Sequence, residues 1–98
     1  MTLPEFNLIE KEKYTIIDIK LEGVIEPEIL KSLSPPRVNF TKGVILSGRC
    51  PVWLFSYLTH YYHPSIFVAT YDPRLGGAVI VESHHVDYNI GDIIKLDI

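Results

Sequence analysis

The sequence predicts an α/β protein: a small mixed sheet with one central βαβ unit followed by an antiparallel hairpin. Residues 43–46 and 66–71 are largely apolar runs, and a helix-length segment, residues 51–62, lies between them. Strand, helix and strand at this spacing are typical of a parallel βαβ unit. Residues 72–77 form a turn rich in proline and glycine, so residues 78–83 are predicted to return as an antiparallel strand.

Elements outside this unit follow from alternation and from proline. Residues 14–22 alternate between apolar and charged side chains, which is the period of a half-buried strand. Residues 26–33 begin with Glu-Pro-Glu and predict a short helix, because proline suits the first helical turn and acidic groups favour that end. Pro35 and Pro36 end it. Residues 94–98 alternate again and predict a last strand.

The central helix is apolar on all sides rather than along one stripe. Its apolar and aromatic side chains are Val52, Trp53, Leu54, Phe55, Tyr57, Leu58, Tyr61 and Tyr62. One face can pack on the sheet, and we expect the other to pack on the same helix of a second copy through a two-fold axis. The alternative is burial of the whole helix within one chain, but little chain remains to cover it. A homodimer is therefore predicted.

Size and composition restrict the class of protein. With 98 residues and a net charge of -3, we expect one domain, residues 1–98, without the basic face that sequence-blind binding to duplex nucleic acid requires. The sequence contains no run of about 18 apolar residues that could cross a bilayer. Its first residues are acidic where a signal peptide is basic, and Cys50 is the only cysteine. A cytoplasmic location without membrane contact is therefore expected.

The segment from Ser47 to Pro51 is the clearest pointer to a ligand. An apolar strand ends there, Arg49 is presented, and a helix begins at a proline. Free N–H groups in such a turn, the positive end of a helix dipole and a guanidinium all favour an anion. We predict that Ser47, Gly48 and Arg49 bind phosphate, and the alternative is that Arg49 pairs with a carboxylate. Cys50 is expected to have a lowered pKa so near a helix start, but no base lies beside it, and we interpret it as structural.

The predicted topology divides the other polar residues between two ends of the sheet. Asp72 and Arg74 follow the carboxyl end of the second parallel strand and share that end with Arg49, where open α/β sheets usually bind ligands. His63 follows the helix, and the hairpin brings His84 to the same, opposite end. Six residues of strand at about 3.3 Å each put roughly 20 Å between His63 and Asp72. One chain therefore cannot place both on one substrate bond.

Each of these residues also has a purely structural interpretation. Asp72 precedes a proline and would commonly be a turn residue, and Arg74 is by default a solvated loop charge. His63 alone would be a surface histidine favoured by the negative end of the helix dipole. His84 and His85 are adjacent, so at most one can face a given site. The sequence has no phosphate loop with Gly-Lys, no cysteine pair for zinc and no nucleophile elbow, which disfavours ATP hydrolysis, zinc binding and serine hydrolysis.

Five segments are distinctive as a set. They are Ser47-Gly48-Arg49, Pro51-Val52-Trp53-Leu54, residues 60–63, residues 68–76 and Ser83-His84. In order and spacing they closely resemble the CRISPR-associated Csx-three proteins, one of the ring nuclease families that degrade cyclic tetra-adenylate and so switch off type III CRISPR signalling. The resemblance runs from about Thr41 to the carboxyl terminus, and Cys50 departs from it where glycine is more often expected.

The resemblance implies a homodimer with a Rossmann-like core, and dimers stacked so that they enclose cyclic tetra-adenylate or a short adenylate RNA. The implied catalytic residues are His63, Asp72 and Arg74, and the implied ligand-binding residues are Ser47, Gly48, Arg49 and His84. Because the family is also similar to a manganese-dependent RNA deadenylase, manganese held by Asp72 and His63 is the expected cofactor.

Several chemical alternatives stay open at this point. The attacking group can be the ribose 2′-hydroxyl, with His63 as general base because imidazole titrates near neutral pH, or a water on a metal ion. A ring nuclease is the first expectation and a deadenylating exoribonuclease the second. The third is a sensor that binds the cyclic nucleotide without cleaving it, and the last is a structural dimerisation module.

Overall fold

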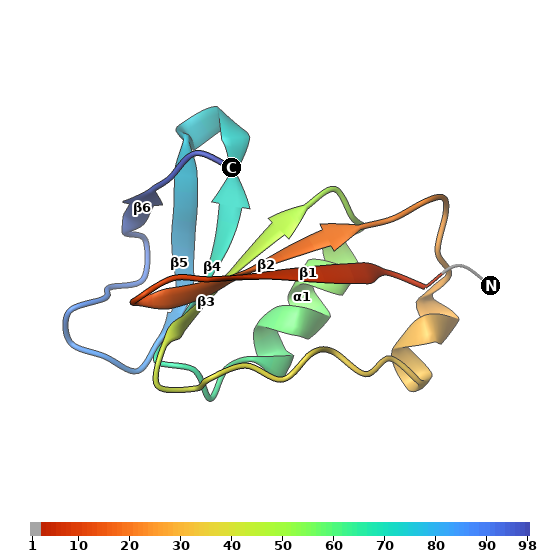
Figure 1. The fold of residues 1–98 in the computed structure, drawn as a ribbon, viewed down its shortest axis with the longest axis horizontal. Helices are drawn as coiled ribbons and strands as arrows, with labels where there is room; N and C mark the ends of the chain where they lie inside the picture. Colours follow the sequence, from red (N-terminus) through yellow and green to blue (C-terminus); the bar gives the residue numbers. More distant parts are fainter. Residues whose placement is uncertain (1–2) are drawn as a thin grey trace.

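The computed structural model describes residues 3–98 and contains one mixed sheet with the helix α1 (Val52–Tyr61) against one face (Figure 1). The strands are β1 (Glu5–Glu10), β2 (Tyr14–Lys20), β3 (Gly43–Gly48), β4 (Phe67–Asp72), β5 (Gly77–Ser83) and β6 (Ile93–Lys95). They lie in the sheet in chain order, with β2, β3 and β4 parallel and the other neighbouring pairs antiparallel. The predicted α/β class, the parallel β3–α1–β4 unit and the β4–β5 hairpin are confirmed.

Outside the central unit, β2 (Tyr14–Lys20) confirms the strand predicted within residues 14–22, whereas the other elements differ from the prediction. Alternation does not predict β1, because Leu8 and Ile9 are adjacent apolar residues, yet β1 pairs along β2 as an edge strand. In place of the helix predicted over residues 26–33, the structure contains only the short 3₁₀ helix η1 (Pro27–Lys31). The last strand covers residues 93–95 rather than 94–98.

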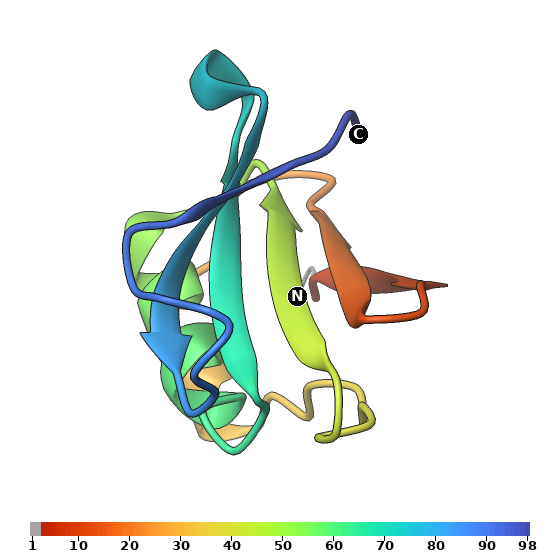
Figure 2. The same ribbon diagram turned by 90° about the vertical axis from the view of Figure 1, so that its left-hand side faces the viewer.

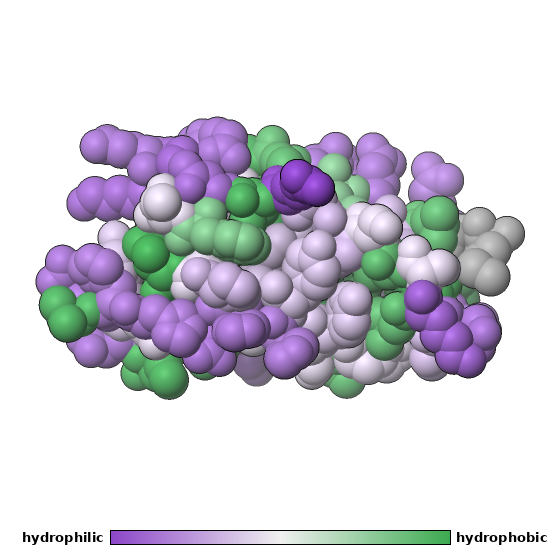
Figure 3. Space-filling model, turned by 90° about the horizontal axis from the view of Figure 1, so that it is seen from below, coloured by the Kyte–Doolittle hydropathy of each residue, from purple (hydrophilic) through white to green (hydrophobic). Residues whose placement is uncertain are grey.

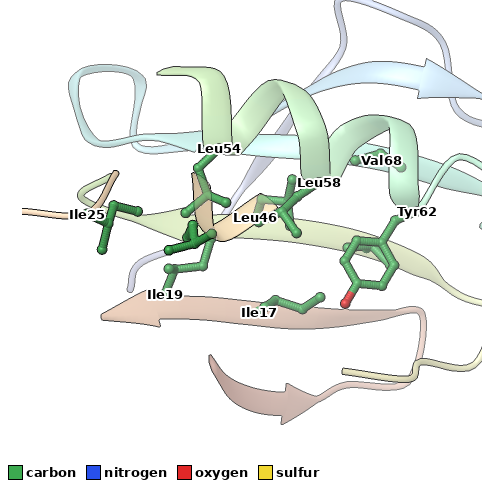
Figure 4. Close-up of a cluster of buried hydrophobic side chains, with 10 residues drawn as sticks. Ile17, Ile19, Ile25, Leu46, Leu54, Leu58, Tyr62 and Val68 are labelled. Carbon is green, nitrogen blue, oxygen red and sulfur yellow. The ribbon is translucent and has the colours of Figure 1, made fainter. Parts of the chain in front are cut away.

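The main core lies between α1 and the parallel strands. Leu54, Leu58 and Tyr62 are fully buried at intervals of four residues, which places them on one face of the helix. Figure 4 shows them directed toward the sheet. They pack in one cluster with Ile17, Ile19, Ile25, Ile29, Val44, Leu46 and Val68. Burying each leucine stabilises the fold by about 1.5 to 3 kcal/mol, so this spacing determines how α1 is rotated on the sheet.

A second, smaller core covers the opposite face of the sheet without a helix. It consists of Ile16, Ile45, Phe67, Ala69, Ala78 and Ile80. The ring of Tyr88, from the segment after β5, lies 4.5 Å from that of Phe67 between centroids. Leu96 packs on the same cluster, where the carboxyl-terminal segment crosses in front of β4 and β5 (Figure 2). Gly43 is required beneath Phe67, because an added Cβ would lie 2.2 Å from the phenyl ring.

Most of the apolar surface of α1 is covered by the chain itself. Trp53, Phe55 and Tyr57 are partly buried and pack against the main core, while Val52 and Tyr61 remain 81% and 40% exposed. Burial within one chain, the alternative to a two-fold helix contact, therefore accounts for much of this helix, and the homodimer stays a prediction. Among residues 3–98, the structure contains no helix with the length and hydropathy needed to span a membrane.

Tyr62 links the end of α1 to the segment that leads into β3. Its hydroxyl donates a hydrogen bond of 2.6 Å to the carbonyl oxygen of Pro36, and its ring contacts the ring of Tyr61 edge-on at 4.9 Å. Burial, with a smaller contribution from Tyr61, raises the pKa of Tyr62 above its ordinary value. The buried phenol therefore stays neutral and acts as a fixed donor.

We expect Tyr62→Phe to lower the free energy of unfolding by about 1 to 2 kcal/mol at neutral pH, because the Pro36 carbonyl loses its donor. In the wild-type protein the unfolded tyrosine ionises near its ordinary pKa of 10.0 while the folded one stays neutral. The contribution of Tyr62 is thus complete below pH 10 and is lost as the pH rises further. The difference between the two proteins, measured by urea denaturation, should narrow above pH 10.

Tyr57→Phe serves as the control, because the Tyr57 hydroxyl has no hydrogen bond to any residue between 3 and 98. This variant should stay within about 0.5 kcal/mol of the wild-type protein at neutral pH. An equal loss in both variants, or a difference that stays constant with pH, would contradict the role given to Tyr62.

Candidate active site

Three histidines gather at the end of α1. His60 is in the last turn of the helix, His63 follows its C-cap, and His84 follows β5. The ring centroids of His60 and His63 are 5.6 Å apart in a stacked arrangement, and those of His63 and His84 are 6.2 Å apart. The backbone N–H of His84 donates to the carbonyl oxygen of Ile66 at 2.9 Å, so antiparallel pairing with β4 brings it here. We call His60, His63 and His84 the histidine cluster.

His85 belongs to its own loop rather than to the histidine cluster. Its Nδ1 accepts a hydrogen bond from the backbone N–H of Asp87 at 3.1 Å, and its ring lies 5.5 Å from that of Tyr88. Of the two adjacent histidines, only His84 faces His63, which is the outcome expected for neighbouring residues at a strand end. His85 is therefore a matched control for substitutions in the cluster.

Asp72 and Arg74 form an ion pair at the other end of β4. The Arg74 guanidinium donates to both carboxylate oxygens, at 3.3 Å from Nε and 3.1 Å from NH2, and its backbone N–H donates to Oδ1 at 2.9 Å. Asp72 thereby caps the 3₁₀ helix η2 (Pro73–Leu75). These bonds from Arg74 hold the pKa of Asp72 below its usual value, and they raise that of Arg74. Asp72 is therefore suited to orient a cation, not to donate a proton.

The length of β4 separates these two groups. The strand has six residues, and at about 3.3 Å per residue it puts roughly 20 Å between His63 and Asp72. Figure 1 shows the tip of the β4–β5 hairpin and the end of α1 at opposite edges of the molecule. Between residues 3 and 98 no group of three or more His, Cys, Asp or Glu side chains is arranged to hold a metal ion. Within one chain, the predicted pair of His63 and Asp72 therefore does not fit a manganese ion.

Ser47 and Gly48 belong to β3 rather than to the turn after it. They pair in register with Asp18 and Ile19 of β2. Ser47 is 5% exposed. Gly48 has a φ of 123°, and an added Cβ would lie 2.2 Å from the carbonyl oxygen of Ile19. The close approach of β2 thus requires glycine at this position, independently of any role of Gly48 in binding a ligand.

Arg49 lies at the mouth of an open cavity of about 390 Å³ at the carboxyl ends of β2 and β3. Among residues 3–98 its guanidinium forms no ion pair, so the alternative of carboxylate pairing applies to Arg74 and not to Arg49. The charged residues lining the cavity are Glu5, Asp18, Lys20, Glu22 and Arg49. Three carboxylates against two cations give this lining a net charge of about −1, so an anion here depends on Arg49 and backbone N–H groups.

The pKa of Cys50 is shifted in the direction opposite to the expected one. Burial raises the pKa of its thiol to about 11, whereas the position near the start of α1 predicts a lowered value. Removal of the thiolate from water outweighs the helix dipole at this site. The structural interpretation of Cys50 is the one that this environment supports.

His60 is a member of the histidine cluster for which the sequence predicts no role. The signal that could have found it is the three-residue interval between His60 and His63 at a helix end, which brings two rings to the same side. Stacking against His60 limits how the ring of His63 can turn, so His60 is a candidate positioning residue.

The fold and these groups define a small mixed α/β protein with a histidine cluster at one end of its sheet and with Arg49 and Arg74 at the other. A family model described as CRISPR-associated protein (Cas_csx3) matches residues 18–95. An uncharacterized protein of Aquifex aeolicus (strain VF5) is 44% identical over 85 residues, which cover 83% of this chain and 77% of the relative. The chain therefore belongs to the CRISPR-associated Cas_csx3 family. The match to the family model begins at residue 18, whereas the resemblance in individual motifs begins only at about Thr41.

We predict that Cys50 reacts slowly with iodoacetamide in the folded protein. A thiol pKa of about 11 against an ordinary value of 9.0 leaves roughly a hundredfold less thiolate at pH 8. The labelling rate, followed by intact mass, should rise by about that factor in urea, and Cys50→Ser should not label. A folded protein that labels as fast as the unfolded one would contradict a buried, neutral thiol.

Proposed function

We propose that this protein is a ring nuclease that cleaves phosphodiester bonds of cyclic tetra-adenylate, at sites shared between stacked dimers. The observation that carries the proposal is the position of the histidine cluster and of the Asp72–Arg74 pair at opposite ends of β4. A phosphodiester that needs both His63 and Arg74 can obtain them only from two copies of such a chain. Membership of a CRISPR-associated family supports this substrate class.

The chemistry that best fits these side chains is intramolecular attack. His63 accepts the proton of a ribose 2′-hydroxyl, and the 2′-oxygen attacks the adjacent phosphorus. The bond from phosphorus to the 5′-oxygen breaks, which leaves a 2′,3′-cyclic phosphate, and the 5′-oxygen takes a proton from water. Arg74 from the next dimer neutralises charge on the phosphoryl oxygens. A guanidinium has five N–H donors, and Asp72 engages two of them. Donors therefore remain for phosphate while Asp72 fixes the orientation.

The proposed assembly is a Rossmann-like dimer that stacks end to end with another dimer. A two-fold dimer presents each group twice, so two cuts in a ring with four phosphates follow from symmetry. Arg49 from each chain grips a neighbouring phosphate, with His84 beside the reacting one. Manganese, which the family resemblance implies, would need His63 and Asp72 from different copies.

We expect His63→Ala to lower turnover of cyclic tetra-adenylate by about 10²- to 10⁴-fold, because the general base is lost, with binding retained. His85→Ala, the matched control in the neighbouring loop, should keep wild-type turnover. The assay separates products chromatographically, with and without manganese, and includes linear tetra-adenylate. Loss of terminal adenosines from the linear strand without ring opening would favour a deadenylating exoribonuclease. Binding without cleavage by the wild-type protein would favour a sensor.

A shared site predicts complementation between inactive variants. An equimolar mixture of His63→Ala and Arg74→Ala should regain about a quarter of wild-type turnover, because one of the four ways of joining two dimers end to end restores a complete site. A mixture of His63→Ala and His63→Gln should regain no turnover, because neither variant supplies the His63 imidazole. Wild-type turnover should also rise more than proportionally with protein concentration. A first mixture no more active than the sum of its parts would exclude the shared site.

A further inference from the structure

A second cavity, of about 370 Å³, opens beside the end of α1 and has no role in the mechanism above. It is lined by Pro36, Arg37, Val38, Phe40, Tyr61 and Tyr62. Two of these residues, Tyr61 and Tyr62, lie in sequence between His60 and His63. The cavity and the histidine cluster therefore belong to the same end of the molecule, within one helical turn of each other. Figure 3, seen from below, shows a pale surface of intermediate hydropathy between hydrophilic and hydrophobic groups.

The walls of this cavity are held in place before any ligand binds. The bond from the Tyr62 hydroxyl to the Pro36 carbonyl joins the two sides. Phe40 is presented by a turn in which Asn39 Oδ1 accepts from the backbone N–H of Thr41 at 2.9 Å and from its hydroxyl at 2.7 Å. Binding in such a cavity needs little ordering of the protein, which favours affinity.

Two aromatic rings in this cavity are left open to solvent. Phe40 is 46% exposed and Tyr61 is 40% exposed, and these are the large aromatic side chains most open to water between residues 3 and 98. Exposed aromatic faces on a fixed backbone are the usual platform for stacking of nucleobases. A flat, aromatic ligand would cover both and release the water in contact with them.

Arg37 supplies a planar cation at the edge of the cavity. It is exposed, and no carboxylate between residues 3 and 98 forms an ion pair with it. The lining contains no acidic residue, in contrast to the cavity beside Arg49. A guanidinium next to aromatic rings can stack on a base or contact a phosphate. The charge and shape of the cavity thus match a nucleotide, with its flat base inside and its phosphate at the rim.

We propose that this cavity binds a purine base of the oligoadenylate substrate, stacked on Phe40 and Tyr61 with Arg37 at its edge. The proposal rests on the function proposed above and adds the place where a base of the substrate is held. It makes Phe40 and Arg37 binding residues that position the ribose and phosphate near His63.

The test uses linear tetra-adenylate in which one adenine is replaced by 2-aminopurine, a base whose fluorescence is quenched by stacking. We expect Phe40→Ala to weaken binding by about 5- to 100-fold, as loss of one base–aromatic stack does, and to lose the quenching. Phe40→Trp keeps a flat ring and should restore both, whereas Phe40→Leu keeps only an apolar side chain and should not. Arg37→Ala should also weaken binding and flatten its salt dependence.

Val24→Ala is the surface control, because Val24 is 88% exposed in the loop after β2 and lines neither cavity. In turnover assays Phe40→Ala should raise KM and keep kcat, the opposite of His63→Ala. Normal binding by Phe40→Ala, alongside lost turnover in His63→Ala, overturns the cavity proposal and leaves the ring nuclease standing. Adenylate binding that depends on Phe40, in a protein that cleaves no ring, supports the cavity and overturns the nuclease. A change of oligomeric state in Phe40→Ala with quenching unchanged shows that a second copy occupies the cavity, and overturns the proposal.

Discussion

The length of β4 fixes the separation of the histidine cluster from the Asp72–Arg74 pair, so His63 and Arg74 of one chain cannot contact the same phosphodiester. The strand is central, hydrogen-bonded to β3 on one side and β5 on the other, and its residues Phe67, Val68 and Ala69 are fully buried. A strand held in this way cannot bend to bring its ends together, since each buried backbone group would lose its partner. Chemistry that needs both ends of β4 therefore needs groups from two copies of the chain.

Arg49 and Arg74, at the carboxyl ends of β3 and β4, have different electrostatic surroundings. Arg74 is restrained by Asp72 and keeps free donors, whereas Arg49 is unpaired but sits among the carboxylates Glu5, Asp18 and Glu22. Phosphate beside Arg49 gains one strong contact and meets repulsion that falls off with distance and with salt. A ligand with several phosphates can place one phosphate at each arginine and hold the others away from the carboxylates. A single phosphate can contact only one of the two arginines. This arrangement favours a ligand with several spaced phosphates over a compact one.

The sequence predicts the centre of this fold better than its edges, for identifiable reasons. Residues 43–46 and 67–69 are buried on both faces of the sheet, and the apolar runs that contain them predict strands. Leu8 and Ile9 instead place apolar side chains on both faces of an edge strand, which hides the alternation of that strand. The histidine cluster follows from topology, because antiparallel pairing returns His84 to the start of β4. The raised pKa of Cys50 cannot be predicted from the sequence in this way, because it depends on burial by residues distant in sequence. The cavity beside Tyr61 also escapes prediction, because a long-range hydrogen bond from Tyr62 to Pro36 forms it.

The last turn of α1 joins the stability of the fold to the geometry of both sites at its end. Successive residues on a helix point about 100° apart, so burial of Tyr62 against the sheet determines where its neighbours are directed. Tyr61 is turned toward the segment of Phe40, and His60 and His63 are turned toward the end of β5. The Tyr62 hydroxyl, tied to Pro36, then prevents rotation of this turn. A single buried phenol thus sets the angle between an aromatic cavity and an imidazole, and any change that lets the turn rotate would disturb the cavity and the histidine cluster together.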